Sequence, residues 1–107
     1  AHIDGYGFGA PVNGDALYNG TLDDAAYVAL LAQLATRRKG KGFARPVLFA
    51  AWTAEEKGLL GARWWLQHPT VPRAQLASVI NLDQLRPLFP LKALTLHGLG
   101  QNTLADT

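Results

Sequence analysis

The stretch "PVLFAAWTAEEKGLLG", residues 46–61, joins an apolar run directly to a pair of neighbouring glutamates. Val47 to Trp52 is continuously apolar, which is typical of a β-strand that is covered on both faces. A helical segment is expected from about Ala54 to Gln67, because it is rich in helix-forming residues and a proline follows it. The stretch therefore predicts a buried strand whose carboxyl end carries Glu55 and Glu56.

The rest of the chain alternates strand-like and helix-like segments. Residues 1–4, 77–83 and 92–98 are the other strand candidates, and apolar residues at helical spacing predict a helix over 23–38. Residues 5–20 are rich in Gly, Asn and Pro and are expected to form a loop. Strands that alternate with helices pair in parallel. We therefore expect an α/β fold, a three-layer αβα sandwich with a mostly parallel sheet, here with about four strands and two to three helices.

The composition excludes several classes of protein. The 107 residues are 49% hydrophobic, which is enough for a packed core, and the net charge of +2 gives no case for binding nucleic acid. Without cysteine there is no disulfide or thiolate metal site, and no apolar run is long enough to span a membrane. The abrupt polar start and the lack of methionine suggest that residues 1–107 are a fragment of one larger domain.

One histidine and several acids are expected to converge at one edge of the sheet. Ligands of open α/β sheets gather beyond the carboxyl ends of the strands, and the start of the 23–38 helix lies on that side. The main candidates are His2, Asp4, Asp24, Glu55, Glu56 and Asp83. Crowded carboxylates repel one another, and a divalent cation removes that penalty. Imidazole combined with carboxylates favours zinc or a similar transition metal.

Each acid also has a simpler interpretation. Thr53 and Glu56 have the spacing of a helix capping box, and Asp23 and Asp24 suit the first turn of a helix. For a single acid this structural role is favoured, but independent capping does not require every acid to lie at one edge. Adjacent helical residues point about 100° apart. One glutamate could therefore bind metal while Glu55 faces the attacking water as a general base.

Four motifs occur in a familiar order and spacing. They are "AHIDGYG" (1–7), "YNGTLDDAAYV" (18–28), "VLFAAWTAEEKGLLGARWW" (47–65) and "VINLD" (79–83). In combination they resemble the dinuclear-zinc aminopeptidases of metallopeptidase family twenty-eight, which also includes carboxypeptidase-like and glutaminyl-cyclase relatives. The resemblance covers about residues 1–86 and implies a zinc-exopeptidase fold.

The resemblance implies two zinc ions and four protein ligands: His2, Asp24, Glu56 and Asp83. Asp24 corresponds to the carboxylate that bridges both ions. His2 and Asp83 correspond to further ligands of one ion, and Glu56 to a ligand of the other.

The resemblance also implies a reaction. Glu55 corresponds to the general base, which takes a proton from the attacking water and returns it to the leaving amine. Asp4 corresponds to the residue that orients the imidazole of His2. The implied substrate is a peptide or an aminoacyl compound, and the family resemblance suggests a secreted or periplasmic protein.

In the family, a final histidine ligand comes from far downstream, beyond residue 107. We therefore expect the isolated fragment to hold fewer than two zinc ions, to be inactive, and to need the remainder of the catalytic domain. Two alternatives stay open. One is a non-catalytic interaction module with a decayed metal site, and the other is a related zinc amide hydrolase or cyclase. His68 is expected to interact with the end of its own helix, not with metal.

Overall fold

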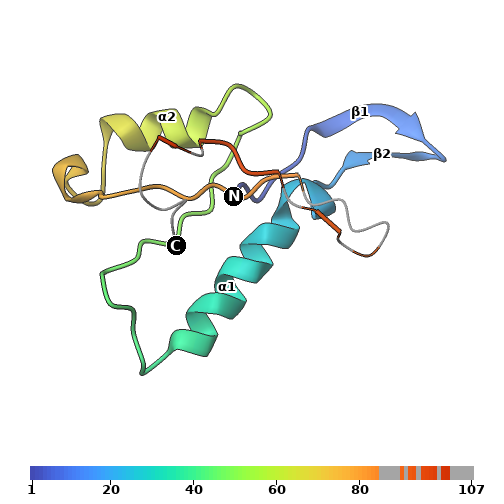
Figure 1. Cartoon of the computed structure of the whole chain (residues 1–107). Helices are drawn as coiled ribbons and strands as arrows, with labels where there is room; N and C mark the ends of the chain where they lie inside the picture. Colours follow the sequence, from blue (N-terminus) through green and yellow to red (C-terminus); the bar gives the residue numbers. More distant parts are fainter. Residues whose placement is uncertain (85–89, 91, 94, 99, 102–107) are drawn as a thin grey trace.

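A β-hairpin follows the amino-terminal segment in the computed structural model, which describes residues 1–84, 90, 92, 93, 95–98, 100 and 101. Strand β1 (Gly7–Val12) pairs antiparallel with β2 (Asp15–Tyr18) (Figure 1). Asn13 and Gly14 close the hairpin with φ angles of 51° and 86°, which suit a tight two-residue turn. The prediction of a loop over residues 5–20 is therefore wrong, because its glycine and asparagine form a turn between two strands.

Helix α1 (Ala26–Arg38) confirms the predicted first helix, but it begins three residues later than expected. The residues before it form an irregular turn, η1 (Thr21–Ala25), in which Asp23 and Asp24 have non-helical φ angles of −120° and −139°. These two acids are therefore not ordinary first-turn residues of the helix. The backbone turns them toward the amino-terminal segment.

Helix α2 (Leu60–Gln67) occupies only the second half of the predicted range 54–67. Its first turn has no side-chain cap, and Leu59 before it has a positive φ of 61°. The expected capping role of Thr53 is wrong, because its hydroxyl donates to the carboxylate of Asp4 instead. A short 3-10 turn, η2 (Arg73–Gln75), follows.

Three segments that are distant in the sequence meet at the amino terminus (Figure 1). His2 forms an isolated parallel bridge with Trp52, in which the N–H of Ile3 donates to the carbonyl of Trp52 at 2.9 Å. On the same segment, the nitrogen of Ala1 donates to Oδ1 of Asn81 at 3.1 Å. The predicted parallel direction of the first two strand candidates is thus observed at one bridge.

The larger sheet is not seen in the part of the chain that the structure describes. That part holds the two-stranded hairpin sheet and two α-helices, and the elements in contact are β1 with β2 and α1 with η1. Residues 77–83 are extended without forming a strand, and the described residues of 92–98 form none, while residue 94 lies outside the described residues. The three-layer parallel sandwich therefore stays a prediction, and the fold is described as a small mixed α/β arrangement.

Burial is concentrated at the meeting point of the segments. Among the described residues the buried side chains are those of Ala1, His2 and Asp24, whereas Val79 and Ile80 are 80% and 76% exposed. The radius of gyration is 16.2 Å, compared with roughly 13 Å for a compact domain of this length. No helix in the described ranges is both long enough and apolar enough to cross a membrane. Within the part of the chain that the structure describes, the most protected side chains are therefore mainly polar.

Candidate metal centre

His2 is held in one orientation and one tautomer. Its side chain is 2% exposed, and Nδ1 lies 2.8 Å from the main-chain carbonyl oxygen of Asp4. A carbonyl can only accept a hydrogen bond, so Nδ1 carries the proton and donates. In the neutral imidazole this leaves the lone pair on Nε2 as the metal-binding atom.

Carboxylates from three other segments face that atom. Asp23 Oδ1 lies 3.3 Å from Nε2 of His2, Glu55 Oε2 lies 3.8 Å away, and Asp83 Oδ1 lies 3.9 Å away. Burial opposes protonation of His2. The hydrogen bond to Asp4 and the surrounding carboxylates outweigh that effect and raise the pKa of the imidazole. A cation is therefore favoured at this point, either a proton or a metal ion.

Asp24 is fully buried beneath His2. Its Oδ2 accepts a hydrogen bond from the backbone N–H of His2 at 3.1 Å, while its buried Oδ1 has no hydrogen-bond partner. Burial raises the pKa of the Asp24 carboxyl, and the nearby charge of Asp83 adds to the effect. An unpartnered buried carboxylate oxygen is costly unless a cation balances it.

Asp4 links the amino-terminal segment to the turn before α2. Its Oδ2 accepts hydrogen bonds from the N–H of Ala54 and the hydroxyl of Thr53, whereas Oδ1 lies 3.7 Å from Nδ1 of His2. Burial opposes ionisation, but these donors outweigh it and hold the pKa of Asp4 below its ordinary value. Asp4 thus contacts His2 most closely through its carbonyl oxygen, not through its carboxylate, and its carboxylate positions the residues just before Glu55.

The glutamate pair lies on the turn that the Asp4 contacts hold in place. Gly61 allows the close approach that this turn needs, because a Cβ at that position would lie 2.6 Å from the carbonyl oxygen of Thr53. Glu55 faces His2, while the carboxylate of Glu56 lies close enough to the hydroxyl of Tyr6 to raise the pKa of that hydroxyl. Both glutamate side chains are partly buried.

The donor atoms form two overlapping sets with His2 in common. In the first set, atoms of His2, Asp24 and Asp83 all lie within 4.8 Å of one another, and in the second the same holds for His2, Glu55 and Glu56. Tetrahedral zinc with bonds of about 2.0–2.2 Å places its ligand atoms about 3.4 Å apart. Within each set the donor atoms lie up to 4.8 Å apart, so a bound ion would draw them closer together. The nitrogen and carboxylate donors also match zinc.

All four predicted ligands, together with Glu55 and Asp4, thus lie in one cluster. Sequence reasoning missed the position of Asp23, which was assigned to the start of the helix although its carboxylate is the nearest to Nε2 of His2. Tyr6 was also missed. The double acid "DD" at 23–24, shortly after the turn signal Asn19-Gly20, was the available signal for Asp23.

The other two histidines lie outside the cluster. Nδ1 of His68 lies 3.1 Å from the carbonyl of Trp64, and its ring stacks on that indole with centroids 4.3 Å apart. This confirms the prediction that His68 interacts with the end of its helix. His97 is exposed and belongs to neither donor set among the described residues.

Comparison with known proteins agrees with the chemistry of this cluster. The sequence model of peptidase family M28 matches residues 1–103, which is nearly the whole chain. No solved structure matches. Peptidases of this family are metal-dependent hydrolases of peptides and generally use zinc. The predicted resemblance to metallopeptidase family twenty-eight is therefore confirmed, and the chain belongs to peptidase family M28.

Proposed function

We propose that this chain carries the metal centre of a dinuclear-zinc exopeptidase of the aminopeptidase type. The observation that carries the proposal is the buried His2, whose Nε2 is faced by carboxylates from three separate segments. The chain has eight acidic residues and a net charge of +2, yet six of the eight lie in this cluster: Asp4, Asp23, Asp24, Glu55, Glu56 and Asp83. Such a concentration of charge needs cations in compensation.

The donor sets suggest how the residues share two ions. His2, Asp24 and Asp83 form one set and would hold one ion. The family resemblance assigns Glu56 and a shared Asp24 to the second ion, whereas the second set in the structure joins Glu56 to Glu55 and His2. Asp23 is an additional candidate, because its Oδ1 is the carboxylate oxygen closest to Nε2 of His2. Asp4 holds the imidazole through its carbonyl oxygen and fixes the turn that carries the glutamates.

Glu55 is the proposed general base. Bound zinc would act as a Lewis acid that polarises the scissile carbonyl. Glu55 Oε2 points toward the donor set and is partly buried, so its carboxylate can take a proton from the attacking water. The same oxygen would then deliver that proton to the leaving amine. The acidic surroundings also favour a substrate with a free amino terminus, since its ammonium group is attracted to carboxylates.

The number of ligands limits what residues 1–107 can do alone. Among the described residues His2 supplies the one imidazole of the cluster for both ions, because His68 and His97 lie outside it. We therefore propose that this stretch binds zinc but hydrolyses peptides little or not at all. Turnover of an aminoacyl p-nitroanilide by residues 1–107, abolished by Glu55→Gln, would contradict this proposal.

A zinc titration against a chromophoric chelator tests the metal centre. We expect tight binding by the unmodified chain and at least tenfold weaker binding by His2→Ala and by Asp83→Asn. Asp15→Asn is the matched control, since Asp15 is a described acid outside the cluster and accepts only a local hydrogen bond from Leu17. If the unmodified chain does not bind zinc, or if His2→Ala binds it equally well, the proposal is wrong and a non-catalytic interaction module is favoured.

A further inference from the structure

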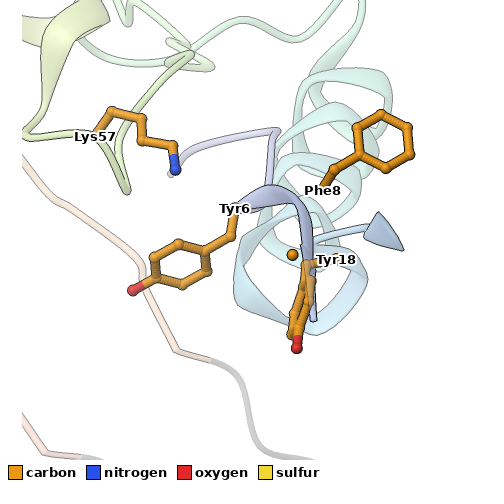
Figure 2. A pocket seen from close by; sticks show the side chains of 5 residues that line it. Tyr6, Phe8, Tyr18 and Lys57 are labelled. Carbon is orange, nitrogen blue, oxygen red and sulfur yellow. The ribbon is translucent and has the colours of Figure 1, made fainter. Parts of the chain in front are cut away.

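A hollow lies beside the candidate metal centre, between the hairpin and the turn that carries the glutamates. Its volume is about 320 Å³, and Tyr6, Phe8, Gly9, Tyr18 and Lys57 line it (Figure 2). This is at the small end of the range for ligand sites, roughly 300–1,000 Å³, and suits one amino-acid residue. The site assignments above use none of its lining residues as metal ligands or as the base.

The hollow adjoins the metal centre through its lining residues Tyr6 and Lys57. The carboxylate of Glu56, the proposed ligand of the second ion, lies close enough to the hydroxyl of Tyr6 to raise the pKa of that hydroxyl. Lys57 follows Glu56 in the sequence, and its Nζ lies 5.5 Å from the centre of the Tyr6 ring. A substrate held at the metal centre would therefore have its next residue within reach of the hollow.

Its walls are aromatic and one of them is held in place. The hydroxyl of Tyr18 donates to the carbonyl of Ala10 at 3.0 Å, which lays the ring across Gly9. A Cβ at position 9 would lie only 2.9 Å from Cε2 of Tyr18, so glycine is needed for this arrangement. Phe8 is 85% exposed, which leaves its ring available to a ligand.

The charges of the two neighbouring regions are opposite. The metal centre is surrounded by six carboxylates, whereas the charged residue lining the hollow is the cation Lys57. A short peptide is itself dipolar, with an ammonium at one end and a carboxylate at the other. Its ammonium suits the acidic cluster and its carboxylate suits Lys57, which fixes the direction of the peptide.

We propose that this hollow binds the residue on the carboxyl side of the scissile bond, an apolar or aromatic residue whose free carboxylate faces Lys57. The inference rests on the proposed exopeptidase function and adds to it a preference for very short peptides. An aromatic side chain would stack against Phe8 and Tyr18, and a longer peptide or a carboxamide would lose the charge contact.

Equilibrium binding tests this without requiring turnover. N-acetyl-L-phenylalanine reproduces the acylated leaving residue with its carboxylate, and N-acetyl-L-phenylalaninamide is the neutral counterpart. In the zinc-loaded protein we expect the acid to bind about three- to fivefold more tightly than the amide, as for an exposed charge pair. Lys57→Met should remove this difference, and Phe8→Ala should weaken binding of both compounds.

The control is Lys39→Met, which removes an exposed cation at the far end of α1 and should leave the preference unchanged. Equal binding of acid and amide, or a preference that survives Lys57→Met, would overturn the proposal. If Lys57→Met still prefers the acid to the amide, the carboxylate of the ligand binds zinc and not Lys57. A protein that fails the zinc titration but retains Lys57-dependent binding would refute the peptidase proposal and leave the hollow as a carboxylate site.

Discussion

Asp23 and Asp24 are neighbours in the sequence, but the structure gives them different environments, and substitutions should separate their roles. Asp24 is fully buried and accepts the backbone N–H of His2, whereas Asp23 is half exposed and faces Nε2 of the same residue. We predict that Asp24→Ala damages both stability and zinc binding. Asp23→Ala should damage zinc binding with little effect on stability.

The magnitudes follow from these contacts. Asp24→Ala leaves the buried N–H of His2 without an acceptor, which costs about 1–3 kcal/mol of unfolding free energy. Asp24→Asn keeps an acceptor oxygen and removes a buried charge that burial disfavours, so the metal-free protein should lose less than about 0.5 kcal/mol. Asp23→Ala removes a half-exposed ion pair, worth at most about 1 kcal/mol. Loss of a zinc-facing carboxylate should weaken zinc binding at least about tenfold.

Two measurements on the same four proteins provide the test. Urea denaturation in the presence of a chelator gives the stability of the metal-free forms, and competition with a chromophoric chelator gives the zinc affinity. The expected stability order is unmodified, Asp24→Asn and Asp23→Ala close together, with Asp24→Ala lowest. If Asp23→Ala binds zinc within twofold of the unmodified chain, Asp23 is not a ligand. If Asp24→Ala is as stable as Asp24→Asn, the hydrogen-bond reasoning is wrong.

Three further predictions concern the base, the turn and the metal. In the complete zinc-loaded catalytic domain, Glu55→Gln should lower kcat on an aminoacyl p-nitroanilide by about 10²–10⁴-fold and change zinc affinity less than about threefold. Glu56→Gln should mainly weaken zinc binding, and the reverse pattern would exchange the two roles. Gly20→Ala should lower the free energy of unfolding in urea by about 2–5 kcal/mol, because φ is 68° and the new Cβ would lie 2.6 Å from the nitrogen of Gly5. The control is Gly14→Ala, which has a φ of 86° but open space around it and should lower the free energy of unfolding by only about 1–2 kcal/mol. Zinc at 1,000 times its Kd should stabilise the folded chain by about 4 kcal/mol, which thermal unfolding measures as a higher Tm. If EDTA leaves the Tm of the zinc-loaded chain unchanged, zinc binding does not stabilise the fold.

The sequence predicted that these acids and His2 converge, but not how they are arranged around one another. Each proposed ligand follows or precedes an apolar segment, and the parallel bridge between His2 and Trp52 shows why such ends come together. Periodicity alone could not show which of Asp23 and Asp24 faces Nε2 of His2. That depends on non-helical backbone angles in the turn before α1, which a helical pattern read from the sequence does not reveal.

Outside the site, the sequence predicted some helices and strands correctly and missed others. Helix α1 was recognisable because Tyr27, Leu30, Leu31 and Leu34 repeat at helical spacing. The hairpin was missed because β1 contains two glycines and a proline and both strands are mostly exposed, so they lack the alternation that marks a half-buried strand. The start of α2 was placed too early because Thr53 has the spacing of a cap, yet its hydroxyl donates to the carboxylate of Asp4, which is distant in the sequence.

The position of the buried centre connects folding to function. Of the side chains that are fully buried in the described ranges, the two largest are an imidazole and a carboxylate, His2 and Asp24. Burying such groups is unfavourable unless charge and hydrogen bonds compensate, and Asp24 Oδ1 has no partner. A bound cation would supply that compensation, so part of its binding free energy would become folding free energy. The proposed metal ligands would then also hold the converging segments together, and losing the metal should loosen these segments as well as stop the reaction.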